Sequence, residues 1–182
     1  MAGIIIFGLF SVLIIIVSWR SLFTIKSHGL YRFLGWECIA WLFAVNYKYW
    51  FYNPFGYQQI LSWTFLIISG YLVIAGAIQL KKIGKPESSR KERTLYKIEQ
   101  TTELIDTGIY RYIRHPLYSS LLFLTWGIFL KNTSIDLLLI SVLSTIFLYA
   151  TAIFEEKECI LFFGETYKDY MKRSKMFIPF LF

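Results

Sequence analysis

Two groups of polar residues stand at the edges of strongly apolar segments in the C-terminal half of the chain. The first group contains Arg114, His115 and Tyr118, and the second is the pair Glu155 and Glu156. Histidine and glutamate can transfer protons, and arginine and glutamate bind groups of opposite charge. Such a set beside an apolar surface is a candidate active site, although it could also be an ion pair that only holds two helices together.

The composition indicates an integral membrane protein with a single domain. Of the 182 residues, 56% are hydrophobic and 20% are aromatic, which is too apolar for an ordinary soluble fold. The net charge is +7, but the Lys and Arg residues lie between the apolar runs, so nucleic-acid binding is not expected. The two cysteines show no metal-ligand spacing, and no metal site is expected either.

Five apolar segments are predicted to cross the bilayer as helices, because about 20 helical residues span a hydrocarbon core roughly 30 Å thick. Pro116 suits the first turn of the fourth segment, where no helical amide partner is lost. The predicted fold class is therefore all-α, a polytopic membrane helical bundle. The segments are residues 2–19, 33–52, 60–80, 112–130 and 135–154.

The fourth and fifth segments are separated by only a few residues, so they must be antiparallel neighbours. The start of one then lies on the same side of the bundle as the end of the other. This topology is expected to bring the first polar group, with Tyr110, close to Glu155 and Glu156.

Lys and Arg residues alternate in number between successive connections. There are three in residues 20–32, none in 53–59, nine in 81–114, one at Lys131 and five after Glu155. By the positive-inside rule the N-terminus is expected outside, with the polar groups at the cytoplasmic face. A basic loop of this kind also attracts anionic lipid headgroups.

The tail after Glu155 is too polar to span a membrane. Phe163, Tyr167 and Tyr170 recur there at helical spacing, opposite charged residues, which predicts an amphipathic interfacial helix. Two polar residues in the N-terminal half also need an interpretation. We interpret His28 as a solvated loop residue and Glu37 as a carboxylate that could line the site.

Four motifs follow one another in the C-terminal part of the chain. In this order they resemble the isoprenylcysteine carboxyl methyltransferase superfamily, which also includes phospholipid N-methyltransferases and small prokaryotic membrane methyltransferases. The small members of that superfamily have about this length and five spans. The motifs are Gly108-Ile109-Tyr110, Arg114-His115-Pro116-Leu117-Tyr118, Glu155-Glu156 and Ile178-Pro179.

The resemblance implies binding of S-adenosyl-L-methionine between the last two spans, with a tunnel from the bilayer for a small lipophilic or lipid-borne acceptor. Residues 101–182 would form the cofactor-binding core, and residues 1–100 would select the acceptor. A glutamate can complement the positive charges of the cofactor, and Tyr, His or Arg can bind its carboxylate and hydroxyls. The implied catalytic residues are Arg114, His115 and Glu156, and the implied cofactor-binding residues are Leu104, Ile105, Tyr110, His115, Tyr118 and Glu155.

One position departs from the isoprenylcysteine enzymes. Thr151 stands where those enzymes are expected to hold the substrate carboxylate with an arginine, which disfavours prenylcysteine as the acceptor. Two other functions remain open. One is an NADPH-dependent membrane reductase of the sterol-reductase type, which has a similar His-Pro-x-Tyr element. The other is a non-enzymatic membrane scaffold with a lipid-binding basic loop.

Overall fold

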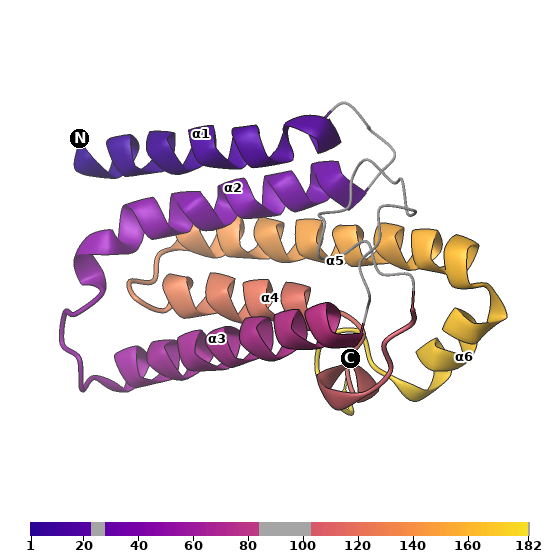
Figure 1. Cartoon of the computed structure of the whole chain (residues 1–182). Helices are drawn as coiled ribbons and strands as arrows, with labels where there is room; N and C mark the ends of the chain where they lie inside the picture. Colours follow the sequence, from indigo (N-terminus) through magenta and orange to yellow (C-terminus); the bar gives the residue numbers. More distant parts are fainter. Residues whose placement is uncertain (23–27, 84–102, 182) are drawn as a thin grey trace.

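Five helices lie side by side in a bundle, and a sixth, short helix packs against one end of it (Figure 1). The structure is a computed structural model that describes residues 1–22, 28–83 and 103–181. No strand is formed within these ranges, and the predicted all-α class is confirmed. The helices are α1 (Ala2–Leu22), α2 (His28–Asn46), α3 (Tyr57–Ile83), α4 (Pro116–Phe129), α5 (Ile135–Phe163) and α6 (Glu165–Arg173), with 3₁₀ turns η1 (Tyr47–Tyr49) and η2 (Gly108–Arg111).

The five predicted spans correspond to α1–α5. Among the residues described, α1, α3 and α5 have the length and hydropathy of a membrane-crossing helix. α2 carries Arg32 and Glu37 within its 19 residues. α4 is apolar but has only 14 residues, about 21 Å at 1.5 Å per residue. The bundle is therefore that of a membrane protein, with α1 on its outside edge (Figure 1).

Small residues set seven apart on α3 allow α4 to approach closely. The Ser62 hydroxyl donates to the Gly127 carbonyl at 2.6 Å, and the Ser69 hydroxyl donates to the Ser120 carbonyl at 2.7 Å. Small side chains of this kind favour close helix packing inside membranes. The seam positions the start of α4, where the first polar group lies.

α2 and α5 are antiparallel neighbours, so the first turn of α2 lies beside the C-terminal part of α5. Tyr31 stacks on Phe154 with ring centroids 5.0 Å apart. Further along the same interface, the Ser144 hydroxyl lies 3.4 Å from the Gly35 carbonyl oxygen. This register places the beginning of α2 at the level of the glutamates of α5.

Several helix boundaries differ from the prediction. α2 begins at His28 instead of Phe33 and ends at Asn46, and α5 continues to Phe163 instead of ending at Phe154. Residues 112–115, predicted to be part of the fourth span, are not helical. His115 precedes a proline and so avoids the α conformation, and the backbone of residues 112–115 forms hydrogen bonds with Lys175 and Met176 instead. α5 continues as a helix because its acidic side chains find partners on neighbouring segments.

The interpretation of His28 as a solvated loop residue was wrong. Its side chain is fully buried at the start of α2, and its Nδ1 lies 2.7 Å from Oε2 of Glu158. The partner that allows its burial is 130 positions away in the chain, so local composition gave no sign of it. Residues 23–27, and residues 84–100 of the predicted basic loop, lie outside the described residues.

The close α3–α4 seam predicts opposite effects for two Gly→Ala substitutions. A Cβ at Gly127 would lie 2.9 Å from Cδ2 of Leu66, whereas a Cβ at Gly70 would meet nothing within 4 Å. Gly70→Ala should raise the free energy of unfolding by up to about 1 kcal/mol through helix propensity. Gly127→Ala should lower it by about 1 kcal/mol, because overpacking outweighs that gain. Unfolding by SDS in mixed micelles measures both, and equal effects would contradict the seam.

Candidate active site

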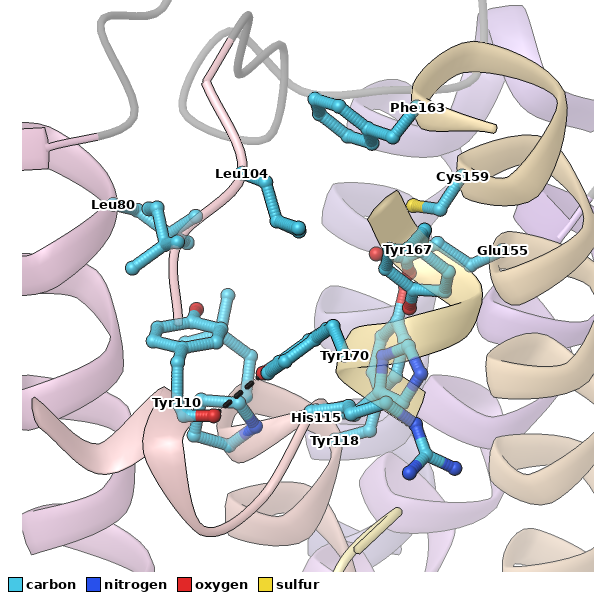
Figure 2. A pocket seen from close by; sticks show the side chains of 14 residues that line it. Leu80, Leu104, Tyr110, His115, Tyr118, Glu155, Cys159, Phe163, Tyr167 and Tyr170 are labelled. Atoms are coloured by element: carbon cyan, nitrogen blue, oxygen red, sulfur yellow. Dashed lines mark hydrogen bonds between the residues drawn. The ribbon is translucent and has the colours of Figure 1, made fainter. Parts of the chain in front are cut away.

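A cavity opens at the end of the bundle where α3 ends, α4 begins and α5 ends (Figure 2). It has a volume of about 80 Å³ and is open to the outside, so it is a narrow slot. Its wall contains all six residues that the sequence resemblance assigned to the cofactor. These are Leu104, Ile105, Tyr110, His115, Tyr118 and Glu155.

The wall is made from segments that are far apart in the sequence. Leu80, Leu104 and Tyr110 lie on one side in Figure 2, and Glu155 and Cys159 lie on the other. α6 supplies two further aromatic residues. The hydroxyl of one of them, Tyr170, donates to the Tyr110 carbonyl at 2.6 Å and so ties α6 to the opposite wall.

The backbone before α4 is fixed by the C-terminal segment. The Arg114 amide donates to the Lys175 carbonyl at 2.8 Å, and the His115 amide donates to the Met176 carbonyl at 3.2 Å. Phe177 is buried against the bundle, as expected for a segment that folds back after the amphipathic helix. His115 therefore has a fixed place although it lies outside a helix.

Glu155 supplies the carboxylate of the cavity. The Tyr118 hydroxyl donates a hydrogen bond to it across the α4–α5 interface. The His115 ring stacks on Tyr118 with centroids 5.5 Å apart and planes 24° apart. A carboxylate that accepts a hydrogen bond from a phenol, with apolar side chains around it, is suited to a cationic group of a ligand.

Glu156, although adjacent in sequence, is not part of the cavity wall. The Arg114 Nε donates to its Oε1 at 2.6 Å, and the His115 Nε2 lies 3.3 Å from the same oxygen. Arg114 also donates to the Ser174 carbonyl at 2.5 Å. This buried ion pair joins α5, the start of α4 and the segment after α6. Glu156 therefore has the contacts of an ion pair that holds helices together, which was the alternative interpretation of the two polar groups.

The sequence did not indicate that Leu80, Cys159, Phe163, Tyr167 and Tyr170 belong to the cavity wall. Burial raises the pKa of the Tyr167 and Tyr170 phenols, so both remain protonated at neutral pH. A signal for some of these residues existed. Phe163, Tyr167 and Tyr170 form the apolar face of the tail, and Cys159 is one helical turn after Glu155.

A second cavity of about 530 Å³ is lined by residues of α4, α5 and the C-terminal segment. Its wall is almost entirely apolar, and the hydroxyl groups in it belong to Ser119, Thr145 and Tyr149. Phe177 lines it and also lies 6.2 Å from the His115 ring, measured between centroids. Phe177 therefore connects the wall of the second cavity with His115 in the wall of the first.

Two residues considered from the sequence lie outside both cavities. Thr151 is buried, and its hydroxyl donates to the Phe147 carbonyl of its own helix at 2.8 Å. Glu37 accepts a hydrogen bond of 2.5 Å from Ser11, which joins α2 to α1. Neither residue belongs to the wall around Glu155.

Comparison with known proteins gives one family and several distant relatives. The family model for phospholipid methyltransferases matches residues 57–169, more than half of the chain. A stretch of 73 residues is 32% identical to a methanethiol S-methyltransferase of Pseudomonas deceptionensis, covering 40% of this chain and 27% of that protein. Methanethiol S-methyltransferase 2 of Bradyrhizobium diazoefficiens is 34% identical over 74 residues, 41% of this chain and 28% of that protein.

These matches cover little more than a quarter of the length of the two relatives. No solved structure matches the chain significantly.

The ion pair of Glu156 predicts a loss of stability on its removal. Glu156→Ala would leave the Arg114 guanidinium partly buried without its anion, which should cost about 3 kcal/mol. Glu165→Ala is the matched control, because Glu165 pairs with Lys168 at the surface and should leave stability unchanged. Tryptophan fluorescence during thermal unfolding in detergent measures both variants. Equal melting temperatures would show that the buried pair does not support the fold.

Proposed function

The chain belongs to the phospholipid methyltransferase family, as its C-terminal motifs predicted, and on this basis we propose that it is an S-adenosylmethionine-dependent membrane methyltransferase of lipophilic acceptors. One observation carries this proposal above all. Six residues scattered from Leu104 to Glu155 line a single cavity, in which Glu155 is the one carboxylate. Neither an ion-pair clamp nor a lipid-binding scaffold requires such a cavity.

The residues present fit the proposed cofactor. Glu155 has the charge needed for its amino group or sulfonium, and Tyr110 and His115 offer groups for its carboxylate and hydroxyls. Leu104 and Ile105 would pack against its adenine. When bound, S-adenosylmethionine supplies a methyl group on a positively charged sulfur, from which a nucleophile can displace it.

The residues of the chain would act on this reaction by binding and alignment. The hydrogen bond from Tyr118 orients Glu155, and the stacked His115 ring fixes Tyr118 in turn. Apolar neighbours exclude water and so strengthen the attraction between Glu155 and a cation. Arg114 and Glu156 would support the site by holding α4 and α5 together.

We assign the acceptor to the second cavity. Ile146 and Tyr149 line it and are also exposed on the outside of the bundle, where lipid would surround the protein. An apolar molecule could therefore enter from the bilayer and approach the stacked rings of His115 and Tyr118. A lipophilic thiol is the first class to test, because the relatives are named for methylation of a thiol and an ionised thiol needs no general base.

The orientation of the protein follows from its charges. We place the N-terminus outside and the cavity at the cytoplasmic face, because basic residues are concentrated in the connections at the cavity end of the bundle. In the same way, we assign cofactor binding to residues 101–182 and acceptor selection mainly to residues 1–100. Leu80 and Phe65 already show that the N-terminal part contributes to both cavities.

Ligand binding tests the cofactor assignment. Protein in nanodiscs should bind S-adenosylhomocysteine, and Glu155→Gln should weaken binding at least about tenfold, because a charge-assisted contact is lost. Tyr118→Phe should weaken it less, since the carboxylate remains. Glu165→Gln, at the exposed surface, should have no effect. Isothermal titration calorimetry gives the dissociation constants.

The same experiment separates the alternative functions. Binding of NADPH instead of S-adenosylhomocysteine would favour the reductase, and binding of neither would favour the scaffold. Normal S-adenosylhomocysteine binding by Glu155→Gln would contradict the role assigned to that residue.

A series of alkanethiols tests the acceptor assignment. Ile146→Trp should fill part of the second cavity and raise KM for long-chain thiols about tenfold, through lost apolar burial, while leaving methanethiol unaffected. Ile67→Trp is the control, because Ile67 is also exposed on the bundle but does not line the cavity. Transfer of labelled methyl groups measures the rates. An equal effect of Ile146→Trp on all thiols would place the acceptor elsewhere.

A further inference from the structure

The first turn and a half of α2 contains two buried basic residues that the proposed site does not use. His28 is 0% exposed and Arg32 is 2% exposed. Both precede residues 57–169, the part of the chain that the family model matches. Burial of such groups is costly unless they have charged or hydrogen-bonding partners.

The partner of His28 is on α5, close to the cavity. Its Nδ1 lies 2.7 Å from Oε2 of Glu158, and Tyr31, one turn of α2 further on, stacks on Phe154. Glu158 is three residues after Glu155, so the two carboxylates are neighbours on one helix. His115 at the start of α4, and then His28 and Arg32 on α2, lie close enough to Glu155 to attract its charge.

Three glutamates therefore stand within about one turn of α5, and ionised carboxylates so close together repel each other. Arg114 forms an ion pair with Glu156, and the His28 imidazole, 2.7 Å from Glu158, pairs with that carboxylate when it is protonated. Among the described residues, Glu155 makes a hydrogen bond with the neutral Tyr118 and no ion pair. Glu155 is the only member of the three that lines the cavity.

We propose that His28 is a positioning residue, which neutralises Glu158 and thereby keeps Glu155 ionised and available to a cationic ligand. Arg32 assists from the next turn of α2 through its charge. The inference rests on the proposed function, because it concerns the affinity of the same site. It assigns a role in cofactor binding to α2, which lies outside the residues 57–169 that the family model matches.

A double-mutant cycle tests this role. His28→Ala should weaken binding of S-adenosylhomocysteine about tenfold, because it leaves the negative charge of Glu158 without a partner beside Glu155. Glu158→Gln alone should change the affinity by less than about twofold. The double variant His28→Ala/Glu158→Gln should recover the affinity of Glu158→Gln, since the repelling charge is gone.

A purely structural role of His28 gives a different result. Loss of packing would not be repaired by Glu158→Gln, so a double variant as weak as His28→Ala would overturn the proposal. Unchanged binding by His28→Ala would overturn it as well. Size-exclusion profiles and melting temperatures identify any variant that fails to fold. If His28→Ala does not fold, wild type and Glu158→Gln can still be compared, and a large loss of affinity in Glu158→Gln would also contradict the proposal.

Infrared spectroscopy tests the coupling without any ligand. At neutral pH, His28→Ala should gain the C=O stretching band of a protonated carboxylic acid, and Glu158→Gln in the same protein should remove it. Absence of that band would overturn the proposal even if the wild type bound no S-adenosylhomocysteine. Failure of wild-type binding alone would contradict only the proposed function.

Discussion

The glutamates near the C-terminal end of α5 constrain how the rest of the chain can pack. A carboxylate on an apolar helix must find a cation or a hydrogen-bond donor before it can be buried. In this protein the partners come from two separate segments: Arg114 and Tyr118 at the start of α4, and His28 at the start of α2. Arg114 is in turn held by the Ser174 carbonyl, which follows α6. Satisfying the glutamates of α5 therefore brings α2, α4 and the segment after α6 to the same end of the bundle.

The apolar contacts give this polar end a firm base. The α3–α4 seam relies on small residues and on hydroxyls that donate to backbone carbonyls, so its distances are set by the backbone and vary little with side-chain rotamers. α2 and α5 are aligned by ring stacking and by the contact of Gly35 with Leu148. A narrow slot between such helices can hold its residues in fixed positions, which is the main requirement for a reaction that depends on alignment.

Much of the fold could be predicted because hydrophobic length and short connections determine it. The five helices, the antiparallel pair at the end and the residues around Glu155 all follow from these features and from the motifs. The sequence could not distinguish the roles of Glu155 and Glu156. Consecutive helical residues point in directions about 100° apart, and which of them meets a cavity depends on the rotation of α5 against its neighbours. The burial of His28 was equally hidden, because its partner is on another helix.

The pairing of residues 112–115 with Lys175 and Met176 has a consequence for biosynthesis. All five helices of the bundle are synthesised before the segment that fixes His115. A nascent chain can insert its bundle while the backbone beside the cavity still lacks this support. Assembly of the site is thus delayed until this segment has been made and pairs with the backbone before α4.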